Sequence, residues 1–155
     1  MPVKSFQGRR SQPKKESLKI PVVSEYMTKK LITFKPDQPI SEVMETLIKN
    51  RISGGPVVNE KNELLGIISE GDCIKQISES RYHNVPGEID KVEKHMQSHV
   101  ETMDGNLNIF DAAKQFLDSK HRRFPILENG KLVGQISQKD ILIAALGQKG
   151  HNWKK

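Results

Sequence analysis

Two short stretches, GIISEGD at residues 66–72 and GQISQKD at residues 134–140, share the pattern Gly-x-Ile-Ser-x-x-Asp. In each, apolar residues typical of a strand lead into a serine, and an aspartate follows three residues later. Ser-x-x-Asp is the signature of a helix N-terminus, where the hydroxyl accepts a backbone amide and the acid reaches back. The same geometry suits an anion site, because free amides and the positive end of the helix dipole meet there. These residues alone leave both interpretations open.

The chain repeats itself around these two stretches. When the sequence is aligned with itself at a shift of 69 residues, identical residues coincide. The shift becomes 68 after a turn that is one residue shorter in the second copy. Two copies are too few for a solenoid, so the sequence indicates two fused copies of one small unit. The identical pairs include Val23 with Val92, Met27 with Met96, Ile40 with Ile109, Pro56 with Pro125, Gly66 with Gly134, Ser69 with Ser137 and Asp72 with Asp140.

Each copy has the same order of predicted elements, β-α-β-β-α. Apolar residues recur at i, i+3, i+4, i+7 and i+8 from Ile40 and again from Ile109, which predicts one amphipathic helix per copy. Asp37 and Asn106 are the expected N-caps of these helices. Asn129-Gly130 is a strong hairpin-turn signal. The other predicted elements are strands at 31–34, 55–58, 64–69, 100–103, 123–127 and 132–137, and helices at 70–77 and 138–146.

The fold class and the domain organisation follow from that order. A unit of about 55 residues is marginal alone, because it buries only about 60% of its unfolded surface. Apolar residues lie on helices and strands of both units, so we expect the units to pack sheet to sheet as one pseudo-symmetric α+β module. We divide the chain into a basic arm at 1–19, a first unit at 20–78, a linker at 79–90, a second unit at 91–147 and a basic tail at 148–155.

The charges of the chain are concentrated at its ends. The net charge is +6; residues 1–19 carry six Lys or Arg against one Glu, and residues 149–155 carry three Lys. The remainder is nearly neutral, so no basic face of a folded domain is implied, and we expect the first 19 residues to be a disordered arm. No apolar run reaches the ~20 residues of a membrane helix, and no secretory signal is evident. With Cys73 as the single cysteine, no intrachain disulfide can form, and a cytoplasmic location fits best.

The aspartates of the two motifs have the chemistry of a sugar anchor. An ionised carboxylate only accepts hydrogen bonds, so Asp72 and Asp140 suit the vicinal hydroxyls of a ribose and would repel a phosphate placed on them. The serines can cap their helices at the same time. The capping interpretation by itself would account for both motifs.

Candidate phosphate ligands are present in the second copy only. Arg122 and Arg123 stand at the start of a predicted strand, and guanidinium groups bind phosphate with paired hydrogen bonds. The alternative is that both are simply solvated. The first copy has Ser53-Gly54-Gly55 at this place, which permits close backbone approach but brings no charge. The two candidate sites are therefore expected to be unequal.

Together these features resemble a tandem pair of cystathionine-β-synthase (CBS) domains, a Bateman module of the stand-alone bacterial type. The resemblance rests on the duplicated β-α-β-β-α order, Met27-Thr28 at the start of a copy, the strand entries GGPVV (54–58) and RRFPI (122–126), and the closing Gly-x-Ile-Ser-x-x-Asp. It covers about residues 20–147. Gln97, which follows Met96, departs from the Thr that the family usually has there.

The resemblance implies which residues bind a ligand. By it, the two aspartates hold ribose hydroxyls, the two serines lie toward the phosphate, and Arg122 and Arg123 reach phosphates in a cleft between the copies, extending toward Asp72. Strand starts near Ile32 and Val100 would give backbone groups and apolar walls to an adenine. The predicted ligand-binding residues are Thr28, Ile32, Gly54, Gly55, Pro56, Ser69, Asp72, Val100, Arg122, Arg123, Pro125, Ser137 and Asp140.

The expected function is regulation by a bound adenosyl ligand (AMP, ADP, ATP or S-adenosylmethionine), signalled to an effector protein through the packing of a homodimer. The alternative is a ligand-free dimerisation or interaction scaffold whose basic tails contact nucleic acid or acidic partners. We expect no enzyme, because no phosphate loop, catalytic triad or nucleophile elbow is present. We expect no metal, no required cofactor and no membrane contact; His95 and His99 are i, i+4 but lack a third ligand.

Overall fold

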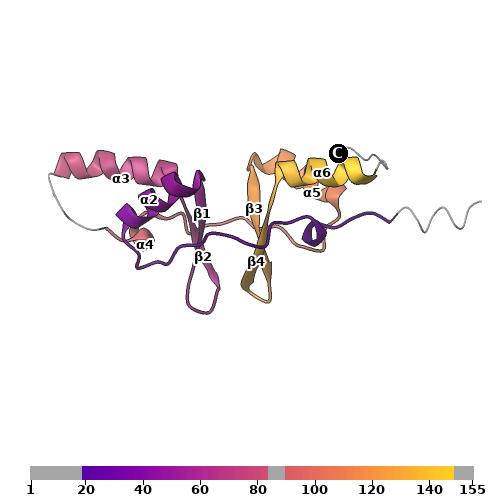
Figure 1. The fold of residues 1–155 in the computed structure, drawn as a ribbon, viewed down its shortest axis with the longest axis horizontal. Coiled ribbons are helices and arrows are strands. Elements are labelled where there is room, and N and C mark those ends of the chain that lie inside the picture. Colours follow the sequence, from indigo (N-terminus) through magenta and orange to yellow (C-terminus); the bar gives the residue numbers. More distant parts are fainter. Residues whose placement is uncertain (1–18, 84–89, 149–155) are drawn as a thin grey trace, which may run out of the picture. The chain divides into compact units, whose positions relative to one another are not determined.

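The computed structural model describes residues 19–83 and 90–148 (Figure 1). Most of the predicted arm 1–19 and tail 148–155, and part of the predicted linker, lie outside these residues. Helices and strands are mixed, and the strands form two two-stranded antiparallel sheets, β1–β2 and β3–β4, which confirms the predicted α+β class. The elements are η1 (Val23–Glu25), α2 (Ile40–Asn50), β1 (Gly54–Val58), β2 (Leu64–Ser69), α3 (Glu70–His83), α4 (Val92–His95), α5 (Ile109–Ser119), β3 (Arg123–Glu128), β4 (Lys131–Ser137) and α6 (Gln138–Gln148).

The predicted apolar stripes form the buried faces of α2 and α5, with one exception in each helix. The stripe residues at i, i+3 and i+7, counted from Ile40 and from Ile109, are buried in both helices. The last stripe residues, Ile48 and Leu117, are 77% and 80% exposed. At 3.6 residues per turn, position i+8 lies about 80° from position i, which turns these two side chains off the buried face.

The predicted N-caps of these helices are wrong. Asp37 and Asn106 lie in the turns before the helices, and the N-caps are Pro39 and Asn108. Asn108 Oδ1 accepts the amides of Phe110 and Asp111, each at 2.9 Å. Pro39 has no side-chain acceptor, so a side chain caps only the second of these helices.

The first predicted strand of each copy is reduced to a single bridge. Phe34 bridges Val57 in parallel, and Met103 bridges Ile126 in parallel. The predictions of strands at 31–34 and 100–103 are therefore wrong in type. The segments run beside β1 and β3, but one bridge each is too little to make a strand.

The hairpins and their following helices match the prediction more closely. β2 has the predicted bounds, and β1, β3 and β4 each gain one residue at an end. Asn129 and Gly130 adopt φ of 55° and 80°, as the turn between β3 and β4 requires. The helix predicted at 70–77 continues to His83, and the helix predicted at 138–146 continues to Gln148.

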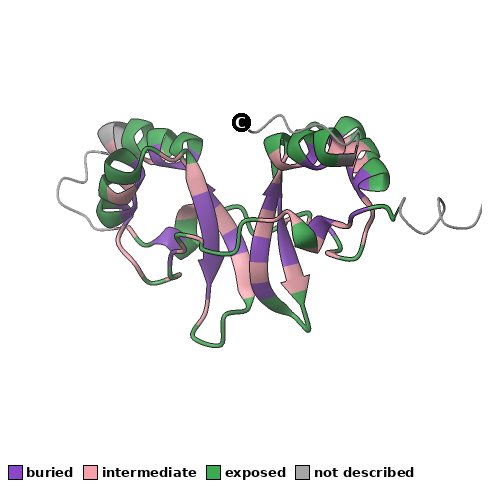
Figure 2. Cartoon of the chain, turned by 45° about the vertical axis from the view of Figure 1, so that its right-hand side comes forward, coloured by how far each residue is buried: buried purple, intermediate pink, exposed green. Residues whose placement is uncertain are grey.

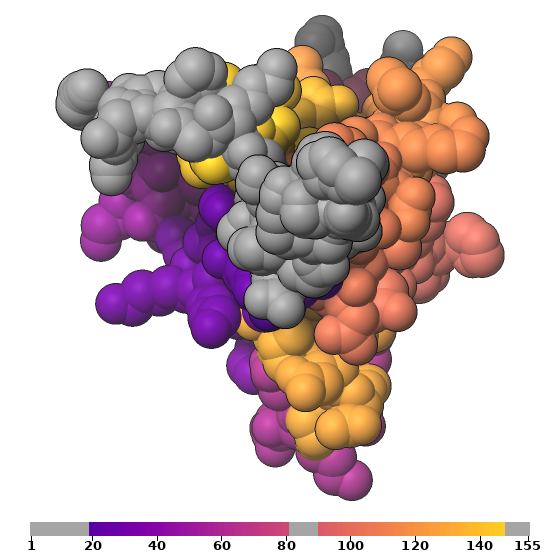
Figure 3. Space-filling model, turned by 90° about the vertical axis from the view of Figure 1, so that its right-hand side faces the viewer, coloured from indigo at the N-terminus to yellow at the C-terminus, as the bar shows by residue number. Residues whose placement is uncertain are grey.

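The tips of the two hairpins lie side by side (Figure 3). Glu63 and Lys131 form an antiparallel bridge. The Asn62 side-chain amide donates to the carbonyl oxygen of Leu132 over 2.8 Å, and Lys131 Nζ donates to the carbonyl oxygen of Lys61 over 2.9 Å. These bonds link the two copies at the ends of their strands.

The opening segment of the first copy packs on the second copy. Val23 N donates to the carbonyl oxygen of Leu107 over 2.9 Å, and Ile109 N donates to that of Pro21 over 3.1 Å. Accordingly, one compact unit of the described chain contains residues 19–27, 105–123 and 136–148.

The opening segment of the second copy packs on the first in the same way. Val92 N donates to the carbonyl oxygen of Gln38, and Ile40 N donates to that of Asp90, each over 2.9 Å. The second compact unit contains residues 28–83, 90–104 and 124–135. Each copy has thus exchanged its first residues with the other, which the sequence repeat alone did not indicate.

Candidate functional site

Both Ser-x-x-Asp motifs form capping boxes at the start of a helix. Before α3, Asp72 Oδ2 accepts the Ser69 amide over 2.9 Å and the Ser69 hydroxyl over 3.0 Å, and Ser69 Oγ accepts the Asp72 amide over 3.3 Å. Before α6, Asp140 Oδ2 makes the matching bonds with Ser137 at 2.8 and 2.9 Å. The capping interpretation is therefore confirmed in both copies, and it leaves Oδ1 of each aspartate to other partners.

Asp72 has a further hydrogen bond that has no counterpart at Asp140 among the described residues. The side-chain amide of Gln97 donates to Asp72 Oδ1 over 2.9 Å. Asp72 is 8% exposed and is the only charged side chain buried among the described residues, and both of its oxygens are satisfied, as burial demands. Asp140 is half-buried, and its Oδ1 has no hydrogen-bond partner within residues 19–83 and 90–148.

The backbone of the exchanged opening segment positions Gln97. The amides of Ile67 and Gln97 each donate to the other's carbonyl oxygen, over 2.9 and 2.8 Å. A Cβ atom on Gly66 would lie 2.7 Å from the carbonyl oxygen of Gln97 and 2.8 Å from Met96 Sδ. Glycine at this position lets the segment approach β2 closely enough for the Gln97 side chain to reach Asp72.

The predicted phosphate ligands lie beside the start of α6. Arg122 and Arg123 are exposed, and the carbonyl oxygen of Arg122 accepts the Gln138 amide over 3.2 Å. This backbone hydrogen bond places the two arginines next to the N-terminus of α6, where Ser137 and Asp140 lie, all within one compact unit. At the equivalent place before α3, the carbonyl oxygen of Ser53 accepts the Glu70 amide over 2.9 Å, and the strand entry brings no cation.

The glycines predicted to approach a ligand serve backbone packing. A Cβ atom on Gly54 would lie 2.7 Å from the carbonyl oxygen of Ile68, and one on Gly55 would lie 2.9 Å from that of Ile32. These contacts account for both glycines without a ligand.

The other predicted residues belong to the unit that contains α3. Thr28 is exposed and exchanges two backbone hydrogen bonds with Gln135, over 2.9 and 3.0 Å. Ile32 is 38% exposed, Val100 is half-buried, and the prolines at 56 and 125 are buried. The structure therefore assigns Arg122, Arg123, Ser137 and Asp140 to one compact unit and the remaining predicted residues to the other.

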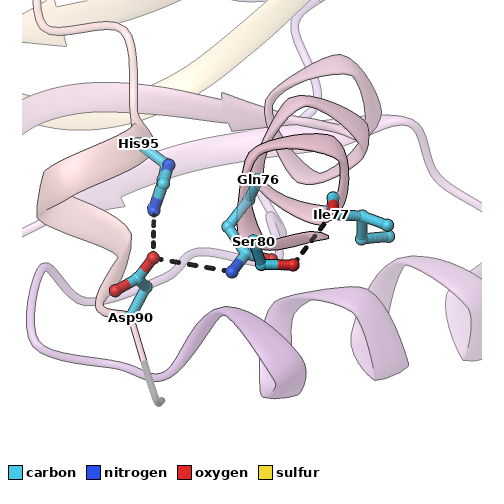
Figure 4. Close-up of polar contacts among 5 residues, drawn as sticks. All are labelled: Gln76, Ile77, Ser80, Asp90 and His95. Atoms are coloured by element: carbon cyan, nitrogen blue, oxygen red, sulfur yellow. Dashed lines mark hydrogen bonds and ion pairs between the residues drawn. The ribbon is translucent and has the colours of Figure 1, made fainter. Parts of the chain in front are cut away.

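A polar cluster around Asp90 was missed by the sequence analysis (Figure 4). Asp90 Oδ2 lies 2.9 Å from His95 Nε2 on α4 and accepts Gln76 Nε2 from α3 over 3.5 Å. The hydrogen bond from His95 lowers the pKa of Asp90 below its usual value. These residues have no spacing typical of a known motif, so only the fold brings them together.

Neither a metal site nor a reactive thiol is evident in the described part of the chain. Residues 19–83 and 90–148 contain no group of three or more His, Cys, Asp or Glu side chains that could hold a metal ion. Burial and the neighbouring Asp72 carboxylate raise the pKa of the Cys73 thiol, which disfavours the nucleophilic thiolate. None of the described helices combines the length and the apolar character needed to cross a membrane.

Comparison with known proteins identifies the repeated unit. The family model of the CBS domain matches residues 23–79 and again residues 89–147. The chain is 34% identical over 150 residues to the CBS domain-containing protein CBSX1, chloroplastic, of Arabidopsis thaliana, a match that covers 80% of this chain and 64% of that protein. It is 28% identical over 120 residues to uncharacterized protein MJ1225 of Methanocaldococcus jannaschii, covering 77% of this chain and 41% of the relative. The chain thus spans less than two thirds of each relative's length.

Comparison with solved structures agrees with the sequence matches. The crystal structure of CBSX2 in complex with AMP superposes with a TM-score of 0.71 at 26% sequence identity. The superposition covers 83% of this chain and 98% of that one.

Proposed function

This chain belongs to the CBS domain family as a tandem pair of CBS domains, and from that premise we propose that it is a regulatory module that binds an adenosine-containing ligand. The ligands considered are AMP, ADP, ATP and S-adenosylmethionine. One observation carries the proposal: within a single compact unit, Asp140 has a carboxylate oxygen that no residue of 19–83 and 90–148 occupies, and Arg122 and Arg123 stand beside the same helix N-terminus. That CBSX2, a structural neighbour, has been crystallised with AMP supports this ligand class.

The ribose and the phosphate of an adenine nucleotide each have a matching group in this proposal. Asp140 Oδ1 accepts the ribose hydroxyls, because it is an acceptor without a partner among the described residues. Arg122 and Arg123 bind the phosphate, and their exposure leaves both guanidinium groups free to turn toward it. Ser137, which caps the same helix, completes the proposed surroundings of the ligand in this unit.

We further propose that the chain acts as a homodimer and signals to an effector protein. The helices of each unit expose large apolar side chains. Figure 2 shows that much of the surface of α3 and α6 consists of exposed residues. Burying such side chains in a second copy is the standard driving force for association. If the dimer can pack in two ways, a ligand shifts the equilibrium between them only by the difference in its affinity for each. The exposed residues are Ile48, Ile74 and Ile77 in one unit and Phe110, Leu117, Leu142, Ile143 and Leu146 in the other.

Isothermal titration of the full chain with the four ligands tests the binding proposal. We expect a binding isotherm with at least one of them, and a loss of about tenfold or more in AMP affinity on Arg122→Gln/Arg123→Gln, since a charge-assisted hydrogen bond contributes about 1.5–3 kcal/mol. The affinity for adenosine, which lacks the phosphate, should fall far less on the same double substitution. Lys114→Gln, an exposed cation on α5 paired with Asp118, is the matched control. The absence of heat with all four ligands, from folded protein, would overturn the proposal.

The alternative function is a ligand-free scaffold whose basic ends contact nucleic acid or acidic partners. The observation in its favour is the concentration of positive charge in residues 1–19, which lie almost entirely outside the described structure. Deleting these residues should abolish nucleic-acid binding and its dependence on salt, and leave nucleotide binding intact. Catalysis is the weakest candidate, because the one cysteine is disfavoured as a nucleophile and CBS pairs are generally regulatory modules.

A further inference from the structure

We propose that Gln97 fills the sugar-hydroxyl position at Asp72, so that each chain binds one adenosyl ligand, at Asp140, and not two. This inference rests on the proposed function and concerns which of its two aspartates is open to the ligand. It is carried by the difference in hydrogen bonding between two otherwise matching capping boxes.

Each carboxylate oxygen can accept about two hydrogen bonds, and Asp72 has few such places left. Its Oδ2 accepts two from Ser69, and its Oδ1 accepts one from Gln97 at 2.9 Å. A ribose diol donates two hydrogen bonds, and about one place remains on Oδ1. To bind through both hydroxyls, the diol would have to displace the Gln97 amide from a carboxylate that is 8% exposed, so the ligand would exchange one good hydrogen bond for another with little net gain.

The backbone of Gln97 is held next to Asp72 before any ligand arrives. Its backbone is joined to β2 by the reciprocal hydrogen bonds with Ile67, and Gly66 admits it at close range. Because this backbone is already ordered, only the exposed side chain of Gln97 has to be ordered when its amide bonds to Asp72. An incoming hydroxyl competes with this amide for Asp72 Oδ1.

The charges near the N-termini of α3 and α6 also favour ligand binding at Asp140 over Asp72. Arg122 and Arg123 stand at the start of β3, in the compact unit that contains Asp140, whereas Ser53 and Gly54 stand at the equivalent place near Asp72. A phosphate-bearing ligand therefore finds cations and an acceptor that no described residue occupies together in the unit of Asp140. At Asp72 it finds an occupied acceptor and no cation from the strand entry.

The test is the stoichiometry of AMP binding to the full chain by isothermal titration. We expect about one AMP per chain for the natural sequence. Gln97→Thr removes the side-chain amide and introduces the residue type that the first copy has at the equivalent position, Thr28. This variant should bind about two AMP per chain. Asp72→Asn added to Gln97→Thr should abolish binding of the second AMP, and Asp140→Asn in the natural sequence should abolish AMP binding. Lys94→Thr, at an exposed position on the neighbouring α4, is the matched control and should still bind about one AMP per chain.

Three results would overturn the inference while leaving the proposed function standing. They are two binding events in the natural sequence, a single event that survives Asp140→Asn, or one unchanged event in a folded Gln97→Thr protein. Gln97→Ser serves as a second variant if Gln97→Thr does not fold. If no variant gives heat with AMP, ADP, ATP or S-adenosylmethionine, the proposed function fails and this inference fails with it.

Discussion

The two capping boxes share one sequence pattern and differ in what surrounds their carboxylates. Asp72 is buried with both oxygens hydrogen-bonded, and Asp140 is half-buried with one oxygen open among the described residues. The difference comes from the exchanged opening segments: residues 90–97 bring Asp90, His95 and Gln97 to the first copy, whereas the second copy receives residues 21–28, with Pro21, Tyr26 and Thr28 at the matching positions. A duplicated motif thus acquires two roles through the partner segment that covers it.

The largest expected effect is the loss of the buried carboxylate. Asp72→Ala leaves the Ser69 amide and the Gln97 amide without their acceptor, and it should lower the free energy of unfolding by about 3 kcal/mol. Asp140→Ala removes only a cap and should cost about 1 kcal/mol. Urea denaturation of both variants measures the two values. Equal losses would mean that the Gln97 contact adds nothing to the first box.

Gly66→Ala should have the next largest effect, because it pushes the exchanged segment away from β2. The added methyl would lie 2.7 Å from the carbonyl oxygen of Gln97, and overpacking of this kind costs about 1–3 kcal/mol. Gly71→Ala is the matched control. Its Cβ meets nothing closer than Ser69 Oγ at 3.7 Å, and alanine in a helix stabilises by about 0.5–1 kcal/mol. Thermal unfolding of both variants checks the opposite signs, and a neutral Gly66→Ala would contradict the close packing.

Removing the Gln97 amide alone should have a smaller effect. Gln97→Met keeps the length of the side chain but cannot donate, so we expect a loss of about 1 kcal/mol in the free energy of unfolding. A double-mutant cycle with Asp72→Asn separates the direct interaction from other consequences of each change. A coupling energy near zero would show that the 2.9 Å contact does not contribute to stability.

The smallest effect concerns the Asp90 cluster, which only the first copy receives. Folding lowers the pKa of Asp90 through the His95 hydrogen bond, so the unfolded chain binds its proton more readily. The resulting stabilisation is present above about pH 4, the ordinary Asp value, and is lost as the pH falls further through the folded pKa. Asp90→Asn should flatten this acid limb, which urea denaturation between about pH 5 and pH 2.5 would reveal. The same slope in both proteins would contradict the assignment.

Local patterns in the sequence predicted the elements that depend on local interactions. The hairpins, the Ser-x-x-Asp caps and the buried faces of α2 and α5 follow from alternation, turn residues and helical spacing over a few residues. The strands expected at 31–34 and 100–103 were wrong, because their pairing depends on a single bridge to another element. The N-cap expected at Asp37 was wrong because the helix begins three residues later.

The sequence by itself determined the duplication, the α+β class and the pairing of each serine with its aspartate, since these depend on residues close together in the chain. Only the tertiary structure decided that residues 90–97 cover the first copy and that Gln97 reaches Asp72, 25 residues away. The physical reason is that hydrogen bonds to a carboxylate depend on distance in space, and a periodic pattern of residues carries no information about which segment is exchanged between two copies.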